Sequence, residues 1–227
     1  MKNKISFIGF DLDGTLIDSH KAVYKCLCDT LPKYVDDDDM SNIIDMVFPL
    51  TIDQFPNYIN FKSKNSFKLF KEEFSKTFDE KYYKTINPIE GYLNILHYCV
   101  EKLGKDKVFI LTNRREESTF QVCEYFDITK IIDPEMIFIT KPNNAKNPKS
   151  DSLKNVRKKL SIVNHKGFYV GDSESDLISA RENNITPLYI SRQDTSSLIN
   201  SNIFLKHKEN YFKSLSELNF FLTSYIW

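Results

Sequence analysis

Residues 5–18, which read ISFIGFDLDGTLID, decide the fold of this chain. Residues 5–10 are almost continuously apolar, which is typical of a strand covered on both faces of a parallel sheet. Two carboxylates follow, Asp11 and Asp13, and then Gly14 lets the backbone turn. Alternate side chains of an extended segment point the same way, so we expect both carboxylates to lie together beyond the apolar sheet. Open α/β sheets bind ligands at the carboxyl ends of their strands, and we therefore predict a site there.

Four more short runs rich in Ile, Val, Phe and Tyr predict further strands, at residues 107–111, 136–140, 167–171 and 187–190. Helical patterns separate these runs. One of them covers residues 92–103 and ends before Gly104, a residue that is typical of a helix C-terminus. The alternation of strand and helix predicts an α/β domain with a parallel sheet.

Residues 19–84 break this alternation because they contain no convincing strand. Phenylalanines there repeat at helical spacing and form one apolar face of a predicted helix: Phe67, Phe70, Phe74 and Phe78. The acidic run at residues 36–39 is interpreted as a solvated turn or a helix start rather than a cation site. We therefore expect a separate helical subdomain at residues 19–84, inserted into a domain made of residues 1–18 and 85–227.

Composition narrows the class of protein. Apolar residues make up 41% and aromatic residues 14% of the 227 residues, which is enough to bury a core. The 31 basic and 31 acidic residues balance, so nothing favours binding to a nucleic-acid backbone. No apolar run approaches the roughly 18 residues of a membrane span, and we expect no secretory signal. The four cysteines match neither a zinc pattern nor a disulfide framework, which indicates reduced thiols in the cytoplasm.

Two other predicted strand ends carry polar side chains that suit a phosphate and a cation. Asp172 follows the strand that begins at Gly167, and Asp176 lies at the start of the next predicted helix. Carboxylates that converge from two strand ends indicate a hard cation with oxygen ligands, and Mg²⁺ fits best. Thr112 and Asn113 follow another strand, where a hydroxyl and an amide can donate to a phosphate oxygen. Thr-Asn is, however, also a common helix start.

Together these strand ends resemble the motifs of the haloacid dehalogenase-like hydrolase superfamily. Residues 11–15, DLDGT, match its first motif, D-x-D-G-T, and residues 171–176, GDSESD, match its fourth, G-D-x-x-x-D. Thr112 closes an apolar strand, as in the second motif. The resemblance spans residues 5 to about 190. It implies a doubly wound, mostly parallel, Rossmann-like sheet, and the helical insert then resembles the cap subdomain of the phosphoglycolate phosphatase and β-phosphoglucomutase branch.

The resemblance also implies a role for each matching residue. Asp11 would be the nucleophile that attacks phosphorus, and Asp13 would protonate the leaving alcohol and then activate a water molecule. Mg²⁺ would be held by Asp11, the backbone carbonyl of Asp13, and Asp172. Asp176 would be an outer or partial ligand of the ion. The phosphate would be bound by backbone and side-chain donors: those of Gly14, Thr112, Asn113 and a lysine.

The third motif of the superfamily is a lysine near a helix start, and three residues in one loop are candidates for it: Lys141, Lys146 and Lys149. We select Lys149 because it lies four residues before Leu153, which belongs to the next helical pattern. Ser150 can then cap that helix. At a helix N-terminus the lysine charge and the helix dipole add together on the phosphate. Lys146 is the second choice.

We expect a Mg²⁺-dependent phosphatase that hydrolyses a small phosphomonoester through an aspartyl-phosphate. The alternative is a phosphomutase of the β-phosphoglucomutase type, which often carries Val or Ile where this chain has Thr15. A third interpretation, a non-catalytic binding protein, is disfavoured by the intact acidic residues. We expect a cytoplasmic monomer or homodimer that takes a small phosphorylated metabolite and binds neither nucleic acid nor membrane. Arg114 and Arg115, at the start of a predicted helix, are expected to be solvated.

Overall fold

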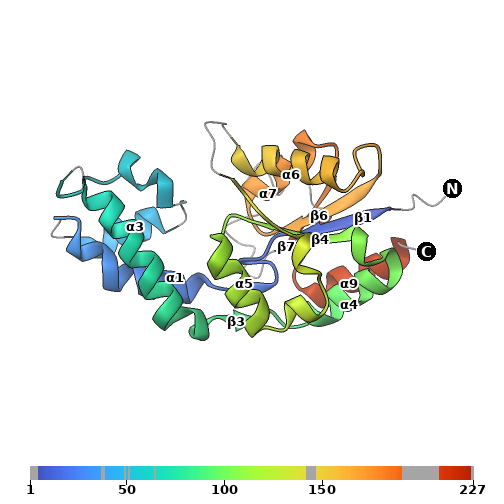
Figure 1. Ribbon diagram of the computed structural model, residues 1–227, viewed down its shortest axis with the longest axis horizontal. Coiled ribbons are helices and arrows are strands. Elements are labelled where there is room, and N and C mark those ends of the chain that lie inside the picture. Colours follow the sequence, from blue (N-terminus) through green and yellow to red (C-terminus); the bar gives the residue numbers. More distant parts are fainter. Residues whose placement is uncertain are drawn as a thin grey trace. The chain divides into compact units, whose positions relative to one another are not determined.

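The computed structural model describes residues 5–36, 39–48, 50, 52–63, 65–141, 147–190 and 210–225. The chain divides into two compact units, the first made of Met1–Ile17 and Pro88–Trp227 and the second of Asp18–Asn87. The first unit contains a large sheet with its helices, and the second is built from helices (Figure 1). Two short strands, β2 (Ile17–Asp18) and β3 (Asn87–Pro88), pair with each other where the chain passes between the units.

The sheet of the first unit has six strands in the order β5-β4-β1-β6-β7-β8, and all neighbours are parallel. The strands are β1 (Phe7–Phe10), β4 (Val108–Thr112), β5 (Ile137–Ile139), β6 (Gly167–Gly171), β7 (Thr186–Ile190) and β8 (Tyr211–Phe212). All but the last are runs that the sequence predicted. β8 escaped prediction because its two residues are too few to show a pattern. The predicted α/β fold with a mostly parallel, Rossmann-like sheet is confirmed.

Helices cover both faces of this sheet (Figure 1). The helices α4 (Tyr92–Leu103), α5 (Glu116–Tyr125) and α9 (Leu215–Tyr225) lie on one face, and α6 (Pro148–Lys159) and α7 (Glu174–Glu182) lie on the other. Every residue of β1, β4 and β6 is therefore buried, which explains why their sequences are almost continuously apolar. As predicted, α4 ends before Gly104, which follows its last residue and whose φ of +95° suits a glycine.

The order of the strands determines where a ligand can bind. From β1 the chain crosses to β4 and then to β5, and it returns to build β6, β7 and β8 on the other side of β1. The direction of travel thus reverses next to β1, which makes this the topological switch point of the sheet. Ligands of open parallel sheets bind beyond the carboxyl ends of the strands at such a point. Asp11, Asp13 and Gly14 follow β1, Thr112 ends β4 and Asn113 follows it, and Asp172 follows β6; these three strands are neighbours at that point.

The second unit has three α-helices within its described residues: α1 (His20–Thr30), α2 (Met40–Val47) and α3 (Ser66–Thr77). A π-helical turn, η3 (Phe78–Tyr82), follows α3. The predicted aromatic face lies in the core of this unit, since Phe70, Phe74 and Phe78 are buried. Asp39, which ends the acidic run, caps α2 by accepting a hydrogen bond from the Asn42 N–H (3.3 Å).

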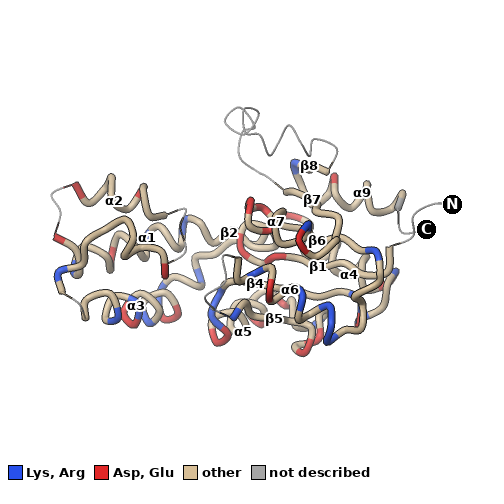
Figure 2. Tube along the Cα trace, turned by 90° about the horizontal axis from the view of Figure 1, so that it is seen from above, with Lys and Arg blue, Asp and Glu red and all other residues tan. Residues whose placement is uncertain are grey.

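Short 3₁₀-helices complete the described elements: η1 (Leu31–Lys33), η2 (Ile52–Asn57), η4 (Tyr83–Thr85), η5 (Lys105–Lys107), η6 (Ile128–Lys130) and η7 (Pro134–Met136). Basic and acidic residues are interspersed along both units, as Figure 2 shows. No helix in the described ranges is long and apolar enough to cross a membrane. The four cysteines are free thiols, and burial raises the pKa of both Cys99 and Cys123 to about 12. Such thiols stay protonated, so they are poor nucleophiles and poor metal ligands.

Candidate active site

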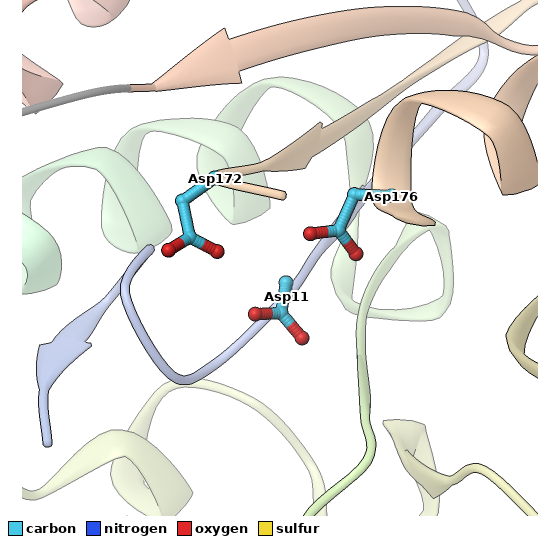
Figure 3. Close-up of side chains that lie close together, drawn as sticks. All are labelled: Asp11, Asp172 and Asp176. Carbon is cyan, nitrogen blue, oxygen red and sulfur yellow. The ribbon is translucent and has the colours of Figure 1, made fainter. Parts of the chain in front are cut away.

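Three carboxylates from two strand ends lie together in the first unit (Figure 3). Asp11 directly follows β1, Asp172 directly follows β6, and Asp176 lies in the first turn of α7. One oxygen of each carboxylate lies within 4.8 Å of the corresponding oxygens of the other two. Asp11 and Asp176 are only 6% and 1% exposed. The structure thus brings together three of the four acids that the sequence singled out.

Two glycines allow the carboxylates to approach one another so closely. Gly14 has a φ of +82°, and a Cβ at this position would lie 1.8 Å from Asp172 Oδ2. A Cβ on Gly171 would lie 2.3 Å from the Cβ of Asp176. A larger residue at either position would therefore displace one of the acids. The Gly14 N–H donates to the Ile17 carbonyl (2.7 Å) and closes the loop, so its contact with a phosphate stays a prediction.

Asp176 belongs to the site and also to the start of its helix. Its Oδ2 accepts hydrogen bonds from the Ser173 N–H (3.1 Å) and the Ser173 hydroxyl (2.5 Å). The Ser173 hydroxyl oxygen in turn accepts a hydrogen bond from the Asp176 N–H (3.2 Å), which completes a capping box. Because these contacts occupy Oδ2, the other oxygen, Oδ1, is left to face the site.

A single buried ammonium group contacts two of these acids. Lys149 is 3% exposed, and its Nζ lies 2.6 Å from Asp11 Oδ1 and 2.5 Å from Asp176 Oδ1. The same atom lies 5.8 Å from the centre of the Tyr169 ring, within the range of a cation–π contact. Lys149 stands in the first turn of α6, where the helix dipole adds to its positive charge. Among the described residues, it is the candidate lysine that contacts Asp11.

The start of α6 differs in detail from the sequence prediction. The helix begins at Pro148, and its N-cap is Asn147, whose Oδ1 accepts a hydrogen bond from the Ser150 N–H (3.3 Å). The prediction that Ser150 caps the helix is therefore wrong, because Asn-Pro already supplies both an N-cap and a first residue without a free N–H. Lys141 is exposed, and Lys146 lies outside the described residues.

The charges of the cluster do not balance, since three carboxylates face one ammonium. Burial raises the pKa of Asp11 to about 7, and Lys149 only partly opposes this effect. Burial, together with Asp11 and Asp176, also holds the pKa of Asp172 well above its usual range. For Lys149, burial alone would lower the pKa, but the carboxylates of Asp11 and Asp176 outweigh burial and raise it well above its usual value. A cluster of oxygen donors with excess negative charge fits a hard divalent cation such as Mg²⁺.

The end of β4 supplies the predicted hydroxyl and amide. Thr112, the last residue of β4, is buried, and its Oγ1 accepts a hydrogen bond from the Arg114 N–H (3.1 Å). Asn113 is exposed. Both residues lie at the carboxyl end of β4, the strand next to β1, although their contact with a phosphate stays a prediction.

Asp13 is paired with Arg114 and not with Lys149, the partner of Asp11. This pair was not predicted from the sequence. Arg114 donates from Nε to Asp13 Oδ2 (3.0 Å) and from Nη2 to Asp13 Oδ1 (2.5 Å). The Arg114 side chain is 8% exposed, so the prediction that it is solvated is wrong. A guanidinium loses its hydrating water when it is buried. Two parallel, charge-assisted hydrogen bonds to one carboxylate, an arrangement called a fork, offset this loss. An aspartate at one strand end and an arginine just past the next were the only signal in the sequence.

The sequence is similar to a known protein family and to a named bacterial protein. A family model described as haloacid dehalogenase-like hydrolase matches residues 8–190. The chain is also 22% identical, over 213 residues, to a protein of Caldanaerobacter subterraneus subsp. tengcongensis that is provisionally named pyrophosphatase PpaX. That match covers 92% of this chain and 90% of the relative.

Solved structures share the fold. A HAD hydrolase of family IA, variant 3, from Entamoeba histolytica has a TM-score of 0.73 at 18% identity, over 94% of this chain and 95% of its own. A predicted phosphoglycolate phosphatase from Haemophilus somnus has a TM-score of 0.71 at 15% identity, over 94% of this chain and 96% of its own. The family match covers most of the sequence and confirms both the resemblance and the prediction of an enzyme. The chain belongs to the family of haloacid dehalogenase-like hydrolases.

Proposed function

We propose that this protein is a Mg²⁺-dependent phosphatase that hydrolyses a small phosphomonoester through an aspartyl-phosphate on Asp11. The observation that carries the proposal is the buried contact between Asp11 and Lys149, beside the carboxylates of Asp172 and Asp176. A carboxylate with a fixed cation beside it can attack phosphorus, because that cation also attracts the phosphoryl oxygens. Membership of the hydrolase family supports the same chemistry.

Two aspartates share the two chemical steps. First, an oxygen of Asp11 bonds to phosphorus while the bond from phosphorus to the leaving oxygen breaks, and Asp13 gives its proton to that oxygen. Second, water attacks the phosphorus of the aspartyl-phosphate, and Asp13 takes a proton from this water. The bond between Asp11 and phosphorus then breaks, which releases inorganic phosphate and restores both carboxyl groups. Lys149 and Thr112 balance the charge of the non-bridging oxygens throughout.

The oxygen donors present at the site suit Mg²⁺. Asp11, Asp172 and the backbone carbonyl of Asp13 would hold the ion, with Asp176 as an outer or partial ligand. The bound ion supplies positive charge to the phosphoryl oxygens. Support for this assignment is the excess of negative charge in the carboxylate cluster, which Lys149 alone does not neutralise.

The helical unit, Asp18–Asn87, is assigned the role of a cap that selects small substrates. Support comes from its place in the sequence, between the first and second motifs, where the family resemblance puts such a cap. A small phosphorylated metabolite in the cytoplasm is the substrate class that this assignment implies. The chain would work there as a monomer or a homodimer.

The test is a screen of phosphate release by the full chain. The panel contains sugar phosphates, 2-phosphoglycolate, nucleoside monophosphates, polyol phosphates and inorganic pyrophosphate, each with Mg²⁺ and with excess EDTA. We expect release from at least one small phosphomonoester in Mg²⁺ and none in EDTA, with the Asp11→Asn variant as the inactive control. Full activity in EDTA would refute the metal assignment. Turnover that requires an added sugar bisphosphate would favour the phosphomutase, and no turnover of any compound would favour a binding protein.

A further inference from the structure

Asp13 is held by one arginine through both of its oxygens. Arg114 donates from Nε to Oδ2 and from Nη2 to Oδ1, so two parallel hydrogen bonds fix the plane of the carboxylate. Asp13 and Arg114 lie 101 residues apart in the sequence. The Asp13 side chain is 31% exposed, whereas that of Arg114 is 8% exposed, so the arginine is the more buried partner and the aspartate the more accessible one.

Arg114 is itself fixed by its own neighbours. Its Nη1 donates to the Ser118 hydroxyl on α5 (2.9 Å), and its backbone N–H donates to Thr112 Oγ1 (3.1 Å). The Thr119 hydroxyl lies 2.8 Å from the Arg115 carbonyl and 3.3 Å from the Arg114 carbonyl, so its hydrogen bond holds the backbone next to Arg114. The backbone of Arg114 is thus tied to the end of β4, and its guanidinium links the start of α5 with the turn after β1. A lysine could not replace it, because a single ammonium does not present two coplanar donors.

The fork leaves Asp13 able to react. Each carboxylate oxygen has two lone-pair positions, and the fork uses one position on each oxygen. The two bonds of the fork alone therefore do not exhaust the capacity of either oxygen to accept a further hydrogen bond or a proton. An arginine in this arrangement sets the direction of the remaining lone pairs, which decides whether a proton can pass to the leaving oxygen.

We propose that Arg114 is the positioning residue for Asp13 and that it acts in both proton transfers of the reaction. This inference rests on the proposed phosphatase activity. Arg114 neither bonds to the phosphoryl group nor exchanges a proton; it holds Asp13 where its proton reaches the leaving oxygen and, in the second step, where it accepts a proton from water. Its loss therefore slows most the substrates whose leaving group needs a proton.

The test compares two substrates of similar size in Mg²⁺, benzyl phosphate and 4-nitrophenyl phosphate. Benzyl phosphate releases an alcohol, which must be protonated as it leaves, whereas 4-nitrophenolate leaves without a proton. The quantity to compare is kcat/KM, because it covers only the steps up to departure of the leaving group. We expect Arg114→Gln to lower kcat/KM about 100-fold for benzyl phosphate and less than about fivefold for 4-nitrophenyl phosphate.

Three further variants complete the design. Asp13→Asn should show the same dependence on the leaving group. Arg114→Lys should recover little of the loss, because it restores the charge without the fork. Arg115→Gln is the matched control, since Arg115 is the next residue, is 45% exposed and pairs with Glu117; both rates should stay at the wild-type level.

Each outcome decides the inference. Equal losses on both substrates would overturn it and indicate that Arg114 binds the phosphate, and wild-type rates on both would overturn it as well. If Asp13→Asn also left both rates unchanged, the proposed role of Asp13 would fail together with the inference. Should Arg114→Gln not fold, as judged by circular dichroism, Ser118→Ala decides instead. A loss of about fivefold on benzyl phosphate alone then supports the inference, and no loss or an equal loss overturns it.

Discussion

Asp11 and Asp13 belong to one turn and are separated by one residue, yet their surroundings differ in charge. Asp11 is buried among Asp172, Asp176 and Lys149, where carboxylates outnumber cations. Asp13 is half-exposed and has an arginine of its own. Under the proposed function a further cation completes the first environment, which we call the incomplete side. In the second, which we call the balanced side, one carboxylate pairs with one guanidinium. Two identical side chains in one motif therefore have surroundings that suit the different tasks we propose for them, one as metal ligand and nucleophile and the other as acid and base.

The largest expected effect is the loss of turnover when Asp11 is replaced. Asp11→Asn should lower turnover by at least ~10⁴-fold, because a neutral amide does not attack phosphorus and is a weaker ligand for Mg²⁺. The measurement is phosphate release from the best substrate of the screen, with circular dichroism to confirm the fold. Activity within tenfold of the wild type would contradict the assignment of Asp11 as the nucleophile.

Loss of the buried ammonium should be the next largest effect. Lys149→Ala should lower turnover about 100-fold, the order of one lost charge-stabilising contact in a closed site. It should also destabilise the metal-free protein by about 3 kcal/mol, because buried carboxylates are left without a counter-charge. Urea unfolding in EDTA and in Mg²⁺ measures the free energy of unfolding. We expect Mg²⁺ to restore most of the stability that Lys149→Ala loses in EDTA. Lys141→Ala is the control, because Lys141 is exposed. If Lys149→Ala stayed active while Lys141→Ala or Lys146→Ala lost activity, the choice of Lys149 as the motif lysine would be wrong.

The sequence predicts the parts of the fold that local patterns determine. The central strands are buried on both faces, so their apolar runs are unmistakable, and the phenylalanines of α3 repeat along one helix face. Asp11 and Asp172 are found because each directly follows such a run. The N-cap of α6 is Asn147, three residues before the predicted Ser150, because Asn147, Pro148 and Ser150 are all plausible at a helix start.

The pair of Arg114 and Asp13 shows what the sequence does not reveal. No local pattern joins residues that lie 101 positions apart, and an arginine at a helix start is usually solvated. The contact exists because β1 and β4 are neighbours in the sheet, which brings their carboxyl ends together. Only the register of the two strands, Phe10 beside Ile110, places the arginine within reach of the aspartate.

A smaller effect is expected in the pH dependence of the free energy of unfolding, where the raised pKa of Asp11 distinguishes its surroundings from those of Asp13. The pKa of Asp11 is about 7 in the folded protein, against an ordinary value of 3.8. Between these values the folded state binds a proton that the unfolded state has lost, so this group lowers the stability of the metal-free protein as the pH rises from about 4 to about 7. Asp11→Asn removes the effect, so its stability relative to the wild type should increase over that range, by up to about 4 kcal/mol.

Urea unfolding of both proteins in EDTA, at intervals from about pH 4.5 to about pH 7.5, measures this difference. Acids outside the cluster cancel in the comparison, and removal of the Asp11 charge also makes the pKa of Asp172 less raised, which changes the stability in the same direction. In Mg²⁺ the advantage of Asp11→Asn should disappear or reverse, because the ion stabilises the ionised carboxylate. If the difference in stability between the wild type and Asp11→Asn did not change with pH in EDTA, the Asp11 carboxylate would already be neutralised by its neighbours. The contrast with Asp13 would then be wrong.

The smallest expected effect is on the balanced side. Arg114→Gln should cost about 1 kcal/mol of stability, as expected for a partly exposed ion pair, and the cost should be the same in EDTA and in Mg²⁺. Its affinity for Mg²⁺, measured by calorimetry, should stay within about threefold of the wild type, because the charge that it removes is separated from the carboxylate cluster by Asp13 itself. Lys149→Ala, measured in the same way, should bind Mg²⁺ more tightly, since a competing cation has gone. A tenfold change in the affinity of Arg114→Gln would mean that the two aspartates share one electrostatic environment, and their division into an incomplete and a balanced side would then be wrong.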